Sequence, residues 1–342
     1  MEFYGRWIQS WERELTLKDR EREIYPFDWG LDWVQDWVQD NGAPVGSPLD
    51  RLKRCAAQAL KSSESFYAVH PPEDTKLEGN LLTFRTPTPT PFPQNNTVTC
   101  RIFKAEGSRA AVVVVPQWNA DAKGHVGLCK LIKRLGMTAV RVTLPYHEMR
   151  SPEGRRRADL MVSPNIGRTL HATRQAVLEL RQVVHLLKSQ GYDRVGMMGT
   201  SLGSCIGYLA FTHEDEIDAG VFNHVSSYFA DVVWSGLATR HVLWGLEGHV
   251  RLPDLRRCWA PLSPWFFVER LADNERPHLM ITAKYDMTFL PELTEQVFQR
   301  YTEFGIPYER VDLPCGHYTT AHFPFNWLDA WHICRYLKRH LG

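Results

Sequence analysis

The sequence predicts an α/β fold in which a mostly parallel sheet is covered by helices on both faces. Two observations lead to this prediction. From residue 110 onward, apolar segments of strand length alternate with longer segments of helical periodicity. One strand-like segment also leads into a Gly-Thr-Ser-Leu-Gly pentapeptide, residues 199–203, and then into a helix-like segment rich in small residues. Alternation of this kind favours parallel strands, whose carboxyl ends form the edge where ligands bind.

Residues 1–75 precede the alternation, and we expect them to form an N-terminal helical extension rich in tryptophan. An aromatic and an acidic series both repeat every four residues, which predicts two stripes on one helix. The stripes consist of Trp29, Trp33 and Trp37, with Val34 and Val38 beside them, and of Asp28, Asp32, Asp36 and Asp40. We expect the tryptophans to pack against the body, with a dimer interface or a roof over the site as alternatives. A second helix is expected over residues 49–63.

Residues 76–342 are expected to form the main domain, with antiparallel strands over 81–85 and 98–103. The segment between these strands, residues 86–93, is rich in proline and should be extended. Further strands are expected near 110–115, 138–143, 194–198, 218–222, 278–283 and 308–313. Helices are expected near 123–135, 168–189, 202–213, 291–304 and 325–340. Residues 224–275 interrupt the rhythm with a segment rich in large aromatic residues.

The pentapeptide matches the G-x-S-x-G pattern of a nucleophile elbow, in which a serine occupies a sharp strand-to-helix turn. Ser201 would expose its hydroxyl at the carboxyl edge of the sheet. Gly199 and Gly203 leave room for the turn, because a side chain at either position would press on the neighbouring helix and strand. The N-terminus of the following helix favours the negative charge that develops in acyl transfer. These features make Ser201 the candidate nucleophile.

A nucleophilic serine needs a histidine base and a carboxylate that orients it, in the chain order Ser, Asp or Glu, His. Asp286 follows the strand expected at 278–283, and we prefer it to Asp312, which lies within a strand, and to Asp273 in a polar linker. His317 follows the last strand and has a glycine before it, which favours it over His322 as the base. The sequence therefore predicts a triad of Ser201, Asp286 and His317.

An oxyanion hole should use the backbone N–H of Leu202, the residue after the nucleophile. A second donor is expected in the loop after residues 110–115, a run of branched apolar residues typical of a strand buried on both faces. Trp118 is the preferred donor in this loop, with Gln117 as the alternative. Backbone amides can serve here whatever side chains the loop carries.

With the elbow, the acid and the base in this order, residues 79–342 resemble the α/β-hydrolase superfamily. Residues 144–152, Leu-Pro-Tyr-His-Glu-Met-Arg-Ser-Pro, are similar to a pattern in uncharacterised α/β-hydrolase-domain proteins related to esterases. The loop after residue 115 departs from the family, because Pro116-Gln117 stands where many members have His-Gly. The resemblance implies that residues 224–275 form a cap over the nucleophile, with aromatic residues that build an apolar pocket.

Composition narrows the class of protein. The net charge of +1 on 342 residues gives no electrostatic case for nucleic-acid binding. The seven cysteines have no C-x-x-C spacing, which favours reduced thiols and gives no zinc-ribbon pattern. The N-terminal residues are too polar and aromatic for a signal peptide, and no segment reaches the length of a membrane span. We therefore expect a soluble cytoplasmic protein.

These observations favour a serine hydrolase, with a carboxylic-ester hydrolase as the first choice. A peptidase or an acyltransferase with the same triad, and a ligand-binding or partner-binding protein that keeps the hydrolase body, are the alternatives. The expected partner is a small-molecule ester, with no cofactor and no metal, and a homodimer is compatible with the sequence. The candidate substrate contacts are Tyr146 and His147, which follow a strand, and Trp234 and Trp265 in the cap segment.

Overall fold

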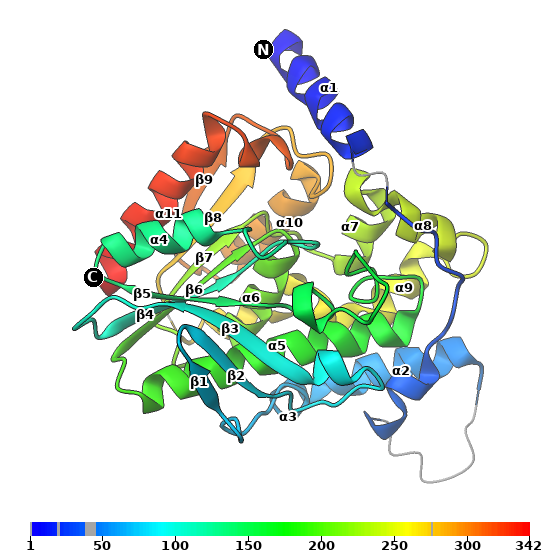
Figure 1. Ribbon diagram of the computed structural model, residues 1–342. Coiled ribbons are helices and arrows are strands. Elements are labelled where there is room, and N and C mark those ends of the chain that lie inside the picture. The colour runs from blue at the N-terminus through cyan, green and yellow to red at the C-terminus, as the bar shows by residue number, and fades with distance from the viewer. Residues whose placement is uncertain (1, 19–20, 38–45, 275) are drawn as a thin grey trace.

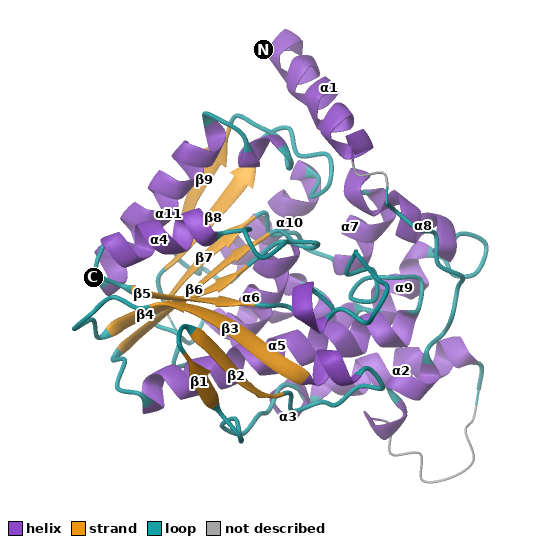
Figure 2. Ribbon diagram, viewed as in Figure 1, coloured by secondary structure: helices purple, strands orange, loops and turns teal. Residues whose placement is uncertain are grey.

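The computed structural model describes residues 2–18, 21–37, 46–274 and 276–342. These residues contain a nine-stranded sheet with the order β1-β2-β3-β5-β4-β6-β7-β8-β9 (Figures 1 and 2). The strands are β1 Lys76–Glu78, β2 Leu81–Arg85, β3 Thr97–Phe103, β4 Ala110–Val115, β5 Thr138–Val142, β6 Arg194–Thr200, β7 Ala219–Asn223, β8 His278–Ala283 and β9 Glu309–Leu313. The pairs from β5 to β9 along this order are parallel, and β1, β2 and β3 are antiparallel to their neighbours. The predicted fold class is confirmed.

The sheet lies between two hydrophobic cores, one on each face. Strand β4 is buried along its whole length, and its alternating side chains divide between the cores: Ala111, Val113 and Val115 face one, and Val112 and Val114 face the other. Successive side chains of a strand point to opposite faces, so a continuous branched apolar run is what a strand buried on both sides requires.

Helices cover both faces of the sheet, as predicted (Figure 2). Helices α1, α4 and α11 contribute buried side chains to the core on one face, and α5, α6 and α10 contribute to the other. The α-helices are α1 Glu2–Lys18, α2 Pro48–Lys61, α3 Ser63–Phe66, α4 Val126–Arg134, α5 Ile166–Ser189, α6 Leu202–His213, α7 Phe229–Ser235, α8 Arg240–Leu246, α9 Leu252–Cys258, α10 Pro291–Glu303 and α11 Phe325–Leu341. Short 3-10 helices occupy Leu31–Trp33, Gln35–Trp37, Pro93–Asn96, Glu148–Arg150, Leu237–Thr239, Ala260–Leu262, Pro264–Leu271 and Thr319–Ala321.

The segment with the tryptophan stripe is not the helix that its spacing predicts. It forms two 3-10 turns, Leu31–Trp33 and Gln35–Trp37. Gly30 stands in the left-handed region at φ 64°, and Asp28 forms a bridge with Asn165, so contacts with the body override the four-residue period. The members of the stripes at Trp29, Trp33, Trp37 and Val34 pack against the core, whereas Val38 and Asp40 lie outside the described residues.

Residues 224–275 lie between β7 and β8 and contain α7, α8, α9 and three 3-10 helices. They gather on one side of the body (Figure 1). Helix α1 has no counterpart among the elements expected from the sequence. Among the described residues, no helix combines the length and the apolar character that crossing a membrane requires.

Candidate active site

Ser201 lies at a strained turn between β6 and α6, with φ 57° and ψ −122°. A residue other than glycine rarely adopts a positive φ, and such strain is concentrated at functional sites. The flanking glycines allow two backbone segments to approach closely. A Cβ on Gly199 would lie 2.3 Å from the carbonyl oxygen of Gly203, and a Cβ on Gly203 would lie 2.3 Å from that of Pro116. The two glycines are therefore required by the packing of the turn.

The structure brings Ser201, His317 and Asp286 together in one chain of hydrogen bonds. Ser201 Oγ lies 2.9 Å from Nε2 of His317, and Nδ1 of His317 lies 2.9 Å from Oδ2 of Asp286. The other oxygen of Asp286, Oδ1, accepts hydrogen bonds of 2.7 Å from the backbone N–H groups of Thr288 and Phe289. The ring of His317 also stacks on that of Phe289, with centroids 5.2 Å apart. The carboxylate and the imidazole are thus fixed in position on both sides.

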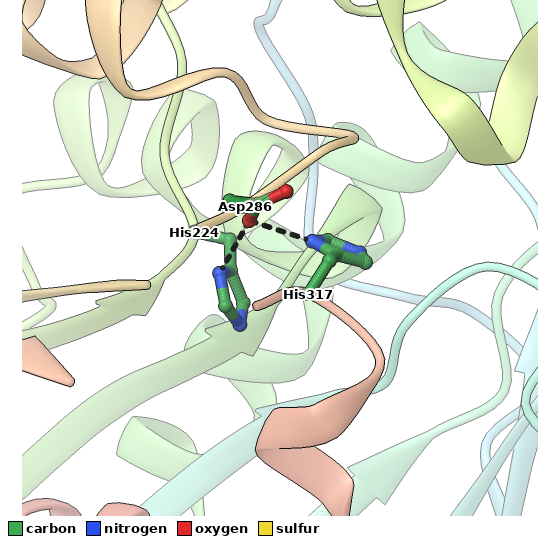
Figure 3. A group of neighbouring side chains, drawn as sticks. All are labelled: His224, Asp286 and His317. Carbon is green, nitrogen blue, oxygen red and sulfur yellow. Dashed lines mark hydrogen bonds and ion pairs between the residues drawn. The ribbon is translucent and has the colours of Figure 1, made fainter. Parts of the chain in front are cut away.

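A second histidine, His224, approaches the same carboxylate oxygen, and it was not among the residues predicted from the sequence. Nδ1 of His224 lies 3.0 Å from Oδ2 of Asp286, so that oxygen faces both imidazoles (Figure 3). His224 directly follows β7 and has a φ of 65°. Its place after a strand puts it at the same edge of the sheet as Ser201, but the sequence contains 14 histidines and gives no sign that this one turns inward.

The pKa shifts of the three groups follow from burial and mutual charge. Burial alone would raise the pKa of Asp286, but His317 and His224 outweigh it and hold that pKa below its ordinary value. Burial would lower the pKa of His317, but Asp286 outweighs it, with a smaller contribution from Glu12, so this pKa is raised. For His224 burial prevails and the pKa is lowered. At neutral pH the site therefore holds an ionised Asp286 beside a neutral His224.

Glu12 of α1 supports the loop that carries His317. Its carboxylate is fully buried and accepts hydrogen bonds from the backbone N–H groups of Tyr318, at 3.0 Å, and Thr319, at 2.7 Å. Gly316 makes room for it, because a Cβ there would lie 2.5 Å from Cδ of Glu12. Sequence reasoning missed Glu12, since more than 300 residues separate it from the loop and no local motif links them.

The rival acid and base candidates lie apart from this cluster. His322 is exposed, with its ring 5.3 Å from that of Trp11. Asp312 is exposed on β9 and pairs with Arg310 at 2.7 Å. Asp273 is exposed as well.

The residues expected to form the oxyanion hole, Leu202, Trp118 and Gln117, all line the cavity that contains Ser201. Leu202 is the first residue of α6, where a backbone N–H has no acceptor within the helix. His147 supports the neighbouring loop, because its Nε2 accepts the backbone N–H of Asn119 at 2.9 Å while its Nδ1 lies 2.8 Å from the carbonyl oxygen of Pro145. Burial lowers the pKa of His147 to about 4, so the neutral ring can accept at Nε2 and donate at Nδ1.

The cavity has a volume of about 1180 Å³, and the residues that line it include Ser201, His317 and several apolar residues of α7. None of the four candidate substrate contacts is among the residues that line it. Tyr146 is buried against Phe92, and His147 holds the loop described above. Trp234 packs against the core, and Trp265 lies beside Tyr228. Tyr146 and His147, which lie at the edge of the sheet where the site is, thus turn into the protein rather than toward the cavity.

His224, Asp286 and His317 place three ligand atoms within 4.8 Å of one another, a set that could also hold a metal ion. The two imidazole nitrogens already contact Asp286 directly, at 2.9 and 3.0 Å. The direct contacts of both histidines with Asp286, and the contact of His317 with Ser201, are enough to explain why these side chains lie so close together.

Comparison with solved structures gives several similar hydrolases. The acylaminoacyl peptidase of Pyrococcus horikoshii has a TM-score of 0.59 at 16% identity, over 76% of this chain and 41% of that one. A puromycin-hydrolyzing peptidase of Mycobacterium tuberculosis has a TM-score of 0.57 at 14% identity, over 78% and 47%. An esterase of Pyrococcus furiosus has a TM-score of 0.53 at 16% identity, over 79% and 93%. The chain thus spans less than half of either peptidase but nearly all of the esterase. No protein-family model and no curated protein sequence matches it.

Proposed function

We propose, with the α/β-hydrolase fold of this chain as the premise, that the protein is a serine hydrolase that cleaves carboxylic esters. The observation that carries the proposal is the hydrogen-bonded sequence Ser201–His317–Asp286 at a strained strand-to-helix turn. A serine, a histidine and a carboxylate in this geometry are what nucleophilic acyl transfer requires. The fold alone would not support the proposal, because unrelated functions share it.

In the proposed reaction, Ser201 Oγ attacks the acyl carbon while Nε2 of His317 takes the hydroxyl proton. Asp286 stabilises the imidazolium, and the backbone N–H groups of Leu202 and Trp118 bind the oxyanion of the tetrahedral intermediate. When the intermediate collapses, His317 passes the proton to the leaving alkoxide and an acyl-enzyme remains. Water then attacks the acyl carbon, with His317 again as the base, and releases the carboxylic acid and free Ser201.

A peptidase is the second candidate, because two of the similar structures are peptidases. The lining of the cavity is largely apolar, which favours an ester with an apolar chain, and its polar members include Gln117, Asn119 and Arg157. An acyltransferase would transfer the acyl group to an alcohol in preference to water. A binding protein would have no need to keep the three side chains in contact.

The test is labelling with a fluorophosphonate probe, followed by hydrolysis of p-nitrophenyl esters and p-nitroanilides. We expect labelling and ester hydrolysis in the wild type and neither in Ser201→Ala or His317→Ala. Ser189→Ala is the control, because this serine is exposed at the end of α5. Well-folded wild-type protein that neither reacts with the probe nor cleaves a substrate would refute the proposal in favour of binding. Faster cleavage of the anilides than of the esters would move the assignment to a peptidase.

A further inference from the structure

We propose that the apolar acyl chain of the ester lies between helices α4 and α11, in the part of the cavity beside Ser201 that these two helices line. This inference rests on the proposed function and adds a substrate class to it, namely esters of medium-length acyl chains. The cap segment, which the sequence suggested as the source of the acyl pocket, contributes other walls of the same cavity.

The cavity that contains Ser201 and His317 is also lined by residues of both helices. Its lining includes Leu128, Leu131 and Leu135 on or next to α4, and Trp327 and Trp331 on α11. Both helices begin near the carboxyl edge of the sheet and lie on the same face of it (Figure 1). Apolar side chains at successive turns of the two helices therefore lead away from the nucleophile, and a chain esterified to Ser201 could follow them.

Small residues of both helices line the cavity. Gly127 lies in the first turn of α4, and a Cβ placed there would have nothing within 4 Å. Ala330 lines the cavity from α11, and Met198 and Thr200 of β6 form part of the lining between the helices. Gly127 is exposed, so the space beside it is open to solvent and to a ligand that occupies the cavity.

The exposed apolar area in this pocket is large for a surface that faces only water. Trp327 is 72% exposed and Trp331 is 52% exposed, while Leu131 is 39% exposed. Leu128 and Leu135 are seven residues apart, which is about 10 Å along a helix at about 1.5 Å per residue. A medium-length acyl chain matches this length and would cover these side chains. Each methylene buried should raise kcat/KM up to about fourfold.

Asp329 is one of several polar residues that line the cavity, with Arg134 and Asn326 among the others. The carboxyl group of Asp329 accepts a hydrogen bond of 2.8 Å from the side-chain amide of Asn223. Burial raises the pKa of Asp329 to about 7. Its partly protonated state near neutral pH reduces the negative charge that Asp329 brings to the cavity.

The experiment compares kcat/KM for p-nitrophenyl acetate and octanoate. We expect the wild type to prefer octanoate at least tenfold. Gly127→Leu should fill the pocket and lower the octanoate-to-acetate ratio about tenfold, and Trp331→Ala should lower it several-fold through lost contact. Trp244→Ala is the control, because this tryptophan is exposed on α8 and does not line the cavity.

An unchanged ratio in both Gly127→Leu and Trp331→Ala, with hydrolysis of either ester, would overturn the pocket and leave the proposed function intact. The absence of any ester hydrolysis by the wild type would instead refute the proposed function. The alternative occupant of this surface is a second copy of the chain. If Trp331→Ala converts a dimer to a monomer and leaves the ratio unchanged, the inference is wrong.

Discussion

Replacing Glu12 by glutamine would separate the charge of this side chain from its shape. The change removes a negative charge from beside the loop of His317 but leaves one carbonyl oxygen to accept a backbone hydrogen bond. In the wild type the buried carboxylate accepts two such bonds, from Tyr318 and Thr319. We expect Glu12→Gln to weaken the hold of α1 on the loop and to alter the titration of His317.

Both effects can be given a direction and a size. A hydrogen bond to a charged group contributes about 1.5–3 kcal/mol, so loss of the charge and of one acceptor should lower the free energy of unfolding by about 2 kcal/mol. Glu12 also helps to raise the pKa of His317. Without that charge the imidazolium is less stable and the pKa falls. Catalysis requires neutral His317, so the acid limb of the kcat/KM profile should move to lower pH.

The assay is a pH profile of kcat/KM on one p-nitrophenyl ester, combined with urea unfolding. Glu14→Gln is the matched control, because Glu14 lies on the same helix with its side chain 67% exposed and 3.2 Å from Lys18. A merely structural role for Glu12 would lower stability without moving the acid limb. If Glu12→Gln has the same acid limb and the same stability as Glu14→Gln, the reasoning about this carboxylate is refuted.

Two further substitutions test the surroundings of the site. His147→Phe removes the acceptor of the Asn119 N–H, so the loop proposed to bind the oxyanion should lose its geometry. We expect kcat to fall about tenfold, which is about 1.4 kcal/mol in the barrier. An unchanged kcat would show that the loop keeps its geometry without His147. Glu179→Ala leaves the fully buried Arg150, now 2.7 Å from the Glu179 carboxylate, without its counter-charge. It should cost about 3–5 kcal/mol in urea unfolding, more than Glu179→Gln, and a loss below 1 kcal/mol would contradict this view of the pair.

The strands and main helices were predictable because their signals are local. The branched run of β4 and the segment 278–283 read as buried strands, and their bounds agree with the structure. The tryptophan series was misread because the same four-residue spacing fits short 3-10 turns once Gly30 and Asp28 are tied to the body. The periodicity of a short segment cannot predict contacts with residues that are distant in the sequence.

The site shows the same limit. The chain order of Ser201, Asp286 and His317, each in the turn or loop that follows a strand, was enough to bring the three to one edge of the sheet. The chain order alone does not predict whether a side chain at that edge points into the cavity or into the protein. Tyr146 follows a strand in the same way, yet it has a φ of 65° and is buried against Phe92. Position after a strand predicts the neighbourhood of a residue, and the backbone conformation decides its contacts.

The N-terminal segment contacts the body at several places, and one of them is the loop that carries His317. Beyond the contact of Glu12 with the His317 loop, a Cβ on Gly167 would lie 1.9 Å from the carbonyl oxygen of Gly30, so the segment lies directly on the first turn of α5. The side-chain amide of Asn165 donates to Asp28 at 2.6 Å at the same place. Glu12 and residues 28–30 thus contact the body directly, and through Glu12 a substitution on α1 can reach the loop that carries His317.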